Sequence, residues 1–458
     1  MFFRQVLYRD LGCASYVLGD AGQAVVVDPR WDIDVYLEIA RTERLRITDV
    51  LDTHDHADHV SGRMRLAQAT GARVHRSACL EEHRGDRISA GQVIAVGSLR
   101  LHALATPGHR PEHLSFTVAD LSRSHDPWLV LTGDSLLVGD LARPDLASEA
   151  DEGARRLHAT LKHLLALGDH VEVWPAHVGG SLCGGAGLSG KTSSTVGFER
   201  RQNPMLLMDE AEFVSGLTGN LPSRPPNVDR IVALNQRREG RHPAEPPPLE
   251  SGRLHEMLSA GVTVLDSRQP DEFDAGHLAG AVNLPVSVPG VGTRAGWALD
   301  SGEQILIVAQ DPTSARQMAS ALQAVGLWQL AGYSLADRSQ WERDGLPVVE
   351  AHSWDLDQLA RGLRQDLVEL VDVRENAEWV DGHVPGSHHV PLRRLRDVSS
   401  VTIPDRGRTT AVVCAAGIRA AFAASLFRRA GRQDVVRVAG GGIGDLSARG
   451  ITLAVGAA

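Results

Sequence analysis

A repeated segment in the second half of the chain constrains its architecture most. Residues 264–285 (VLDSRQPDEFDAGHLAGAVNLP) match residues 370–391 (LVDVRENAEWVDGHVPGSHHVP), and each matched pair is 106 positions apart. Seven matched pairs are identical, among them Asp266/Asp372, Arg268/Arg374, Glu272/Glu378, His277/His383 and Gly280/Gly386. An apolar run, a short loop and a helical pattern follow each copy. Repetition at this period predicts two tandem α/β domains of about 100 residues each.

The first half of the chain has a different pattern. Residues 1–180 contain short apolar runs, which are SYVL, AVVVD, ITDVLD, LRLHALA, WLVLTGD and VEVWPAH. Helical patterns such as residues 151–167 alternate with these runs, and this alternation predicts a layered α/β domain. The proline-rich stretch at residues 241–250 is typical of a linker. We therefore predict three domains, at residues 1–248, 249–350 and 351–458.

Composition narrows the possible function classes. The formal net charge is −10 at pH 7 and no basic run occurs, so nothing indicates nucleic-acid binding. No apolar run is long enough to span a bilayer or to act as a leader, and we expect a cytoplasmic homo-oligomer with no membrane contact. The 4 cysteines form no CxxC pair, which fits a reducing compartment.

A histidine-rich segment, THDHADH (53–59), is the strongest chemical signal in the sequence. Side chains that could bind a metal follow four separate apolar runs: His54, His56, Asp58, His59, His109, Asp134 and His177. Loops at one edge of a sheet can bring such residues together. A lone histidine is more often a surface or capping residue, but HxHxDH with three further strand-end motifs indicates a metal site.

This pattern resembles the metallo-β-lactamase fold superfamily over about residues 1–240. THDHADH matches the family's HxHxDH signature, and the later His, Asp and His motifs follow in the expected order. The resemblance implies an αββα sandwich with metal at one sheet edge. It does not choose a reaction, because the fold hosts both hydrolases and oxidoreductases.

Two metal centres are compatible with these ligands. All seven side chains could hold two zinc ions, with a bridging hydroxide that attacks a thioester. Alternatively, His54, His109 and Asp134 could hold one iron as a two-histidine, one-carboxylate triad that leaves open positions for O₂ and a substrate. The ligand inventory alone does not separate the two.

The segments TPGHRPEHLSF, TGDSLLVGDLARPDL and PAHVGGSLCG resemble the persulfide dioxygenases, especially members fused to rhodanese domains. This resemblance implies one Fe(II) per chain on His54, His109 and Asp134. The remaining residues, His56, Asp58, His59 and His177, would then orient the ligands and water.

Two further residues lie close to these motifs in the sequence. Arg143 is either a contact for an anionic substrate group or a solvated loop arginine, and both interpretations stay open. Cys183 lies in a glycine-rich loop after His177, where a small loop residue is favoured over a reactive thiol.

A second candidate site lies in TAVVCAAGIRAAFAASLF, which predicts a strand, a short loop and a helix. Cys414 begins the loop and Arg419 ends it. Loop amides and a helix N-terminus would favour a thiolate on Cys414 and would bind an anionic sulfur group. A buried structural cysteine is the alternative.

These residues resemble a rhodanese over about residues 352–458, which implies that Cys414 carries sulfur as a persulfide. Ala415 stands where an arginine often follows the cysteine, and the tryptophan usual after the GG motif is absent, which puts affinity for thiosulfate in doubt. The first repeat also resembles a rhodanese, but Asp311 stands at its nucleophile position. Since a carboxylate cannot form a persulfide, we expect this copy to be structural.

Taken together, the motifs predict a non-heme iron dioxygenase that oxidises a thiol persulfide, such as that of glutathione or coenzyme A, to sulfite with O₂. The rhodanese would then combine sulfane sulfur with sulfite to give thiosulfate, a route for sulfide detoxification. A zinc-dependent thioester hydrolase of the glyoxalase II type is the first alternative, and a non-catalytic sulfur carrier is the second. Metal content and oxygen uptake distinguish the three.

Overall fold

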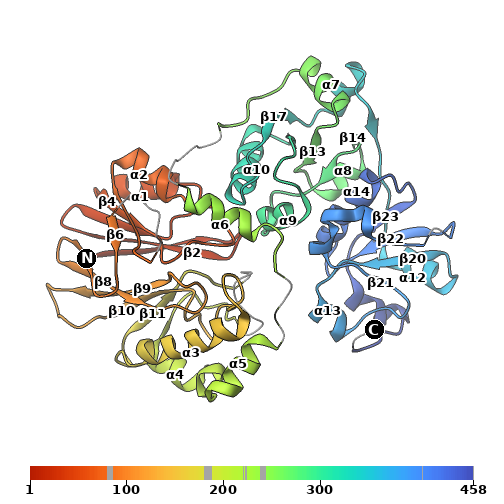
Figure 1. The fold of residues 1–458 in the computed structure, drawn as a ribbon. Helices are drawn as coiled ribbons and strands as arrows, with labels where there is room; N and C mark the ends of the chain where they lie inside the picture. The colour runs from red at the N-terminus through yellow and green to blue at the C-terminus, as the bar shows by residue number, and fades with distance from the viewer. Residues whose placement is uncertain are drawn as a thin grey trace. The chain divides into compact units, whose positions relative to one another are not determined.

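The computed structural model describes residues 1–79, 86–179, 188–219, 221, 224–237, 244–404 and 406–456 (Figure 1). The chain divides into two compact units. The first comprises Met1–His242 with Ala324–Gly326, and the second comprises Pro243–Gln323 with Leu327–Ala458. This division does not test the predicted domain boundaries at residues 248 and 350. No helix in the described part of the chain has the length and apolar character needed to cross a membrane.

Unit 1 is built on two sheets, each with six strands among the described residues. The first has the order β1 (Phe2–Tyr8), β2 (Cys13–Asp20), β3 (Gln23–Val27), β4 (Arg46–Leu51), β5 (Arg73–Ser77) and β6 (Asp86–Ile88). The second has the order β12 (Ser194–Thr195), β11 (Glu172–Pro175), β10 (Leu129–Gly133), β9 (Leu114–Asp120), β8 (Leu99–Ala105) and β7 (Val93–Val96).

Alternating side chains on these strands decide how the sheets pack. Tyr16, Leu18, Val25 and Val27 from the first sheet form one buried cluster with Leu101, Phe116, Val118 and Leu131 from the second. The intervening residues, such as Val17 and Val130, pack against helices on the two outer faces. Because successive side chains of a strand point to opposite faces, this period-two pattern buries both faces of each sheet.

The outer faces of unit 1 are covered by helices. Side chains of α1 (Asp34–Thr42) and α2 (Arg63–Thr70) pack against the first sheet. Side chains of α3 (Ala150–Leu165), α4 (Val196–Gln202) and α5 (Glu210–Thr218) pack against the second. A 3₁₀ helix at Pro204–Leu207 and α6 (Val228–Gln236) complete the unit. The predicted αββα sandwich is confirmed, and the predicted helical pattern at residues 151–167 falls in α3.

Unit 2 contains two parallel sheets. One has the order β15 (Val282–Asn283), β13 (Thr263–Asp266), β16 (Ile305–Ala309) and β17 (Leu330–Leu335). The other has the order β19 (Ser353–Trp354), β23 (Val435–Val438), β22 (Thr409–Val413), β20 (Val368–Asp372) and β21 (His388–His389). The first repeat also contains a short antiparallel pair, β14 (His277–Leu278) with β18 (Val348–Val349).

Helices surround both sheets of unit 2 (Figure 1). The first repeat contributes α7 (Ser251–Ser259), α8 (Pro270–Asp274), α9 (Val291–Ala298), α10 (Pro312–Ala324) and α11 (Arg338–Arg343). The second contributes α12 (Leu356–Arg364), α13 (Asn376–Asp381), α14 (Ile418–Arg429) and 3₁₀ segments at Leu392–Ser400 and Ile443–Arg449. The predicted α/β class is therefore confirmed for both repeats.

The Asp and Arg residues that recur in both repeats form an ion pair in each copy. Arg374 binds Asp372 through Nη2 at 2.7 Å and also donates to the carbonyl of Gly382 at 2.7 Å. Arg268 binds Asp266 at 2.6 Å in the same way. Such bidentate pairs fix the turn after the strand in each copy.

Contacts within unit 2 join the two repeats. Arg437, which is 4% exposed on β23, donates through Nε to Asp274 at 2.6 Å and also pairs with Asp271, and both acids lie on α8. The amide of Asn283 donates to Ser425 Oγ at 3.0 Å. A buried guanidinium needs such carboxylate partners, because an unpaired buried charge is strongly destabilising.

Candidate metal centre and cysteine loop

Four strands of unit 1 deliver the candidate ligands to one place. β4 ends at Leu51 just before His54, and β8, β10 and β11 end shortly before His109, Asp134 and His177. β8 and β10 are both antiparallel to β9, and β10 is parallel to β11. The carboxyl ends of these three strands therefore lie at the same edge of the second sheet.

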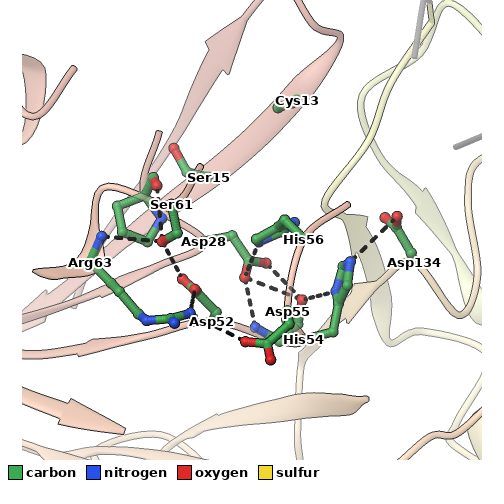
Figure 2. Close-up of polar contacts among 12 residues, drawn as sticks. Cys13, Ser15, Asp28, Asp52, His54, Asp55, His56, Ser61, Arg63 and Asp134 are labelled. Carbon is green, nitrogen blue, oxygen red and sulfur yellow. Dashed lines mark hydrogen bonds and ion pairs between the residues drawn. The ribbon is translucent and has the colours of Figure 1, made fainter. Parts of the chain in front are cut away.

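The HxHxDH loop is anchored by Asp28, which directly follows β3. Its carboxylate accepts the amide of Thr53 at 2.6 Å, the hydroxyl of Thr53 at 3.1 Å and Nε2 of His56 at 3.1 Å. Figure 2 shows Asp28 beside His56, with the buried Arg63 paired to Asp52 on the other side of the loop. Asp28 was not identified from the sequence, although an acid directly after the buried run AVVV was a usable signal.

Three donor atoms converge on one point in this loop system. His54 Nε2 lies 3.7 Å from Asp134 Oδ2, and His109 Nε2 lies 3.4 Å from the same oxygen. Figure 2 shows His54 and Asp134 facing each other. All three side chains are buried, and these three atoms have no hydrogen-bond partner among the described residues. Buried polar atoms are almost always paired, so the arrangement fits a metal ion held by two histidines and one carboxylate.

The other ring nitrogens fix both histidines for this role. His54 Nδ1 donates to the Thr53 hydroxyl at 2.9 Å, and His109 Nδ1 donates to the carbonyl of Arg143 at 2.8 Å. Each Nε2 therefore keeps its lone pair for a ligand bond. Burial, reinforced by neighbouring His56, holds the pKa of His54 well below its usual value, and burial also lowers the pKa of His109. Neutral imidazoles are the form that binds metal.

Asp134 is positioned by His113, a residue that sequence reasoning missed. The amide of Asp134 donates to His113 Nε2 at 2.9 Å, and His113 stacks on His54 with ring centroids 4.9 Å apart. Burial lowers the pKa of His113 to about 3, so the ring stays neutral and can accept this bond. Gly133 adopts a φ of 54°, and a Cβ there would meet His113 Nε2 at 2.4 Å, so only glycine fits before Asp134.

The remaining predicted ligands form a second group beside the first. His177 Nδ1 donates to Asp134 Oδ1 at 2.6 Å, and His177 Nε2 lies 2.9 Å from Asp58 Oδ2. His59 Nδ1 lies 3.0 Å from Asp58 Oδ1. The group also contains Cys13, which the sequence pattern did not single out. His56 belongs to neither group, because it lies with Asp28 and Asp52.

Arg143 and Cys183 also stand out in the sequence, close to the metal-ligand motifs. Arg143 is buried, and its guanidinium forms two hydrogen bonds of 2.7 Å with Asp145. Its carbonyl, rather than its charge, is the group that contacts the candidate ligand His109. A contact between Arg143 and substrate stays a prediction. Cys183 lies outside the residues that the structure describes.

The loop after β22 has the expected strand, loop and helix arrangement. Cys414 is buried, and the amide of Gly417 donates to its Sγ at 3.0 Å. Gly417 adopts a φ of 91°, which turns the chain into α14. Gly442 closes the loop from the other side, since a Cβ there would lie 2.3 Å from the carbonyl oxygens of Cys414 and Ala415. The sequence GGG at 440–442 was the available signal for this close approach.

Arg419 and Asp311 have clear local partners. Arg419 makes a bidentate pair with Glu378 through two contacts of 2.6 Å, so a residue that recurs in both repeats holds the end of the cysteine loop. Asp311 in the first repeat is exposed and accepts the amides of Thr313 at 2.7 Å and Ser314 at 2.9 Å. These bonds cap α10, which is a structural role.

Comparisons with known proteins agree with this geometry. Residues 8–177 match the metallo-beta-lactamase superfamily, and residues 251–337 and 355–448 each match the rhodanese-like domain. The mitochondrial persulfide dioxygenase ETHE1 of Bos taurus is 30% identical over 232 residues, which cover 49% of this chain and 83% of that protein. A hydroxyacylglutathione hydrolase of Saccharophagus degradans is 30% identical over 226 residues, which cover 46% of this chain and 74% of that protein.

A solved structure extends the comparison. The crystal structure of a metallo-beta-lactamase from Staphylococcus aureus has a TM-score of 0.65 and 28% sequence identity, and the match covers 74% of this chain and 99% of that one. The chain belongs to the metallo-β-lactamase superfamily, as a fusion of a domain homologous to persulfide dioxygenases with two rhodanese-like domains.

Proposed function

We propose that the chain oxidises a low-molecular-weight thiol persulfide with O₂ at one iron ion held by His54, His109 and Asp134. The observation that carries this proposal is the set of three buried donor atoms, two nitrogens and one oxygen, that have no partner among the described residues. Iron, when bound there, would supply the redox chemistry that couples O₂ to sulfur. The balanced reaction is RSSH + O₂ + H₂O → RSH + SO₃²⁻ + 2H⁺, in which the sulfane sulfur loses four electrons to O₂.

The chain's own residues would prepare this reaction. The Thr53 hydroxyl and the Arg143 carbonyl fix the two histidine rings, and His177 holds one oxygen of Asp134 so that the other faces the metal position. Burial raises the pKa of Asp134, but the neighbouring His177 lowers it, and the net effect is a lowered pKa that keeps the carboxylate charged. A triad fixed in this way leaves the other coordination positions to O₂ and substrate.

The second repeat would use the sulfite. Cys414 would take sulfane sulfur from a second persulfide, Cys–SH + RSSH → Cys–SSH + RSH, and pass it on by Cys–SSH + SO₃²⁻ → Cys–SH + S₂O₃²⁻. The amide of Gly417, which already donates to Sγ, supports a negative charge at this sulfur. Covalent linkage of the two sites in one chain raises the effective concentration of their shared intermediates.

The experiment that tests this proposal measures metal content, oxygen consumption and products for the purified full-length protein with glutathione persulfide. About one iron per chain, oxygen uptake and thiosulfate formation are expected, because one triad binds one ion. Zinc without iron, together with no oxygen uptake, would overturn it.

A zinc-dependent thioester hydrolase is a second candidate, favoured by two observations. Asp58, His59 and His177 add three candidate ligands beside the triad, as a second zinc ion would need, and hydroxyacylglutathione hydrolases are among the relatives. Hydrolysis of S-lactoylglutathione by zinc-loaded protein, without oxygen uptake by iron-loaded protein, would favour this candidate.

A further inference from the structure

Cys13 lies with Asp58, His59 and His177 in a second group of side chains that could hold a metal ion. It is 5% exposed, and its Sγ lies 3.1 Å from Asp58 Oδ2, 3.5 Å from His177 Nε2 and 3.7 Å from His59 Nδ1. Each of these three distances lies within the range of a direct hydrogen bond that involves sulfur. The thiol donates to Asp58 and fills space between three side chains that could ligate an ion.

The ligand atoms of the triad and those of the group around Cys13 differ in how many hydrogen bonds they already make. The three atoms of the triad, one each from His54, His109 and Asp134, are buried without partners among the described residues. In the group around Cys13, by contrast, both oxygens of Asp58 and both ring nitrogens of His177 face other polar atoms of the centre, and His59 contributes one bonded nitrogen. His59 Nε2 is the exception, since it has no partner in the described part of the chain. The second group is therefore largely satisfied by its own hydrogen bonds.

Backbone pairing fixes the position of the thiol. The amide of Ala14 donates to the carbonyl of Ala176 at 2.7 Å, and the amide of Val178 donates to the carbonyl of Gly12 at 2.8 Å. Cys13 and His177 form an isolated antiparallel bridge between these bonds. The sulfur and the His177 ring are thus held side by side by main-chain contacts, and a change of side-chain rotamer alone would not separate the two strands.

We propose that Cys13 limits this centre to one metal ion by occupying and hydrogen-bonding the group formed by Asp58, His59 and His177. The inference rests on the proposed function, because it explains how a chain with further candidate ligands beside the triad could work with a single ion. Cys13 is a positioning residue here, since it acts through Asp58 and His177 rather than on substrate.

The test counts bound ions. The full-length protein is stripped with a chelator and reloaded with Co²⁺, and bound cobalt per chain is measured by elemental analysis together with the optical spectrum. Wild type should bind about one ion and Cys13→Ala about two, because the alanine leaves Asp58, His59 and His177 free to ligate. Cys414→Ser is the matched control, since it removes another buried thiol in the other unit, and it should stay at about one ion, as one triad requires.

Two other outcomes would overturn the inference. Two ions in wild type, with a thiolate-to-cobalt charge-transfer band that Cys13→Ala loses, would make Cys13 a ligand. A count in Cys13→Ala that stays at wild-type level would show that the thiol does not set the number of ions. If Cys13→Ala does not fold, His59→Gln decides: an unchanged count supports the inference, and a lower count overturns it. Oxygen uptake by iron-loaded wild type tests the proposed function separately, because it depends on which reaction the triad supports and not on the cobalt count.

Discussion

Replacement of Asp28 by asparagine tests whether the carboxylate after β3 organises the metal centre. Asp28 is 4% exposed and accepts three hydrogen bonds, from the amide and hydroxyl of Thr53 and from His56. The amide of asparagine is a donor on one side, so at least one of the three bonds must be lost. Asn tolerates the φ of 51° at this position, so the change adds no backbone strain.

The expected effect follows from these contacts. A hydrogen bond to a charged acceptor is worth about 1.5–3 kcal/mol, so the loss of one bond and weakening of another should lower the free energy of unfolding of unit 1 by about 2–4 kcal/mol. The Thr53 hydroxyl also orients His54, so metal affinity should fall by about 10–100-fold. Calorimetric unfolding and a chelator competition titration measure the two quantities.

Asp32→Asn is the control for this experiment. Asp32 is a part-exposed acid on the same unit that pairs with Arg30, and its replacement should change stability by less than about 0.5 kcal/mol. If Asp28→Asn matches this control in both stability and metal affinity, the carboxylate does not organise the loop and the reasoning is refuted.

Three further predictions concern the triad, the cysteine loop and acid stability. His54→Ala should abolish iron binding and oxygen uptake, whereas His56→Ala should weaken them by about 10–100-fold, as measured by iron content and an oxygen electrode; equal loss in both variants would contradict the proposed ligand set. Cys414→Ser should abolish thiosulfate formation but leave oxygen uptake, with sulfite as the product, whereas Asp311→Asn should keep both activities. Chromatography of the sulfur products measures this, and undiminished thiosulfate in Cys414→Ser would assign sulfur transfer to another thiol. Burial lowers the pKa of His277 to about 4, below the 6.5 of an ordinary histidine, so the unfolded chain takes up the proton first and unit 2 should lose stability as pH falls from about 6.5 to about 4. His277→Gln should flatten this pH dependence in thermal melts, and an unchanged profile would show that another group causes it.

Much of the centre could be predicted because its residues follow strands in a fixed order. His54, His109, Asp134 and His177 each stand a few positions past an apolar run, and adjacent strand ends in a sheet bring them together. Cys414 and Arg419 were visible for a similar reason, since a strand, loop and helix in direct succession leave little freedom in the loop.

The residues that escaped sequence analysis act over long separations. Cys13 meets His177 across 164 positions, through strand pairing that no local pattern announces. His113 lies in the same segment as His109, but its contact is with the backbone of Asp134, which follows another strand, β10. Arg143 also contributes a group that a sequence motif does not reveal, because its main-chain carbonyl accepts a hydrogen bond from His109 Nδ1. Local motifs therefore reveal ligand-binding side chains more readily than they reveal the groups that position those side chains.

The buried pairing of Arg437 with α8 has a consequence for any attempt to use the sulfur-transfer module elsewhere. Asp271 and Asp274 correspond, at the offset of 106 residues, to Ala377 and Val380, so the acids that receive Arg437 exist in one copy only. The two copies are not interchangeable, because separation of the second copy from α8 would leave the Arg437 guanidinium without these two acids. A fragment that begins at residue 351 would carry Cys414 but would leave Arg437 without either acid. We therefore expect the pair of repeats, rather than the second repeat alone, to be the smallest segment that keeps these buried contacts when it is moved to another protein.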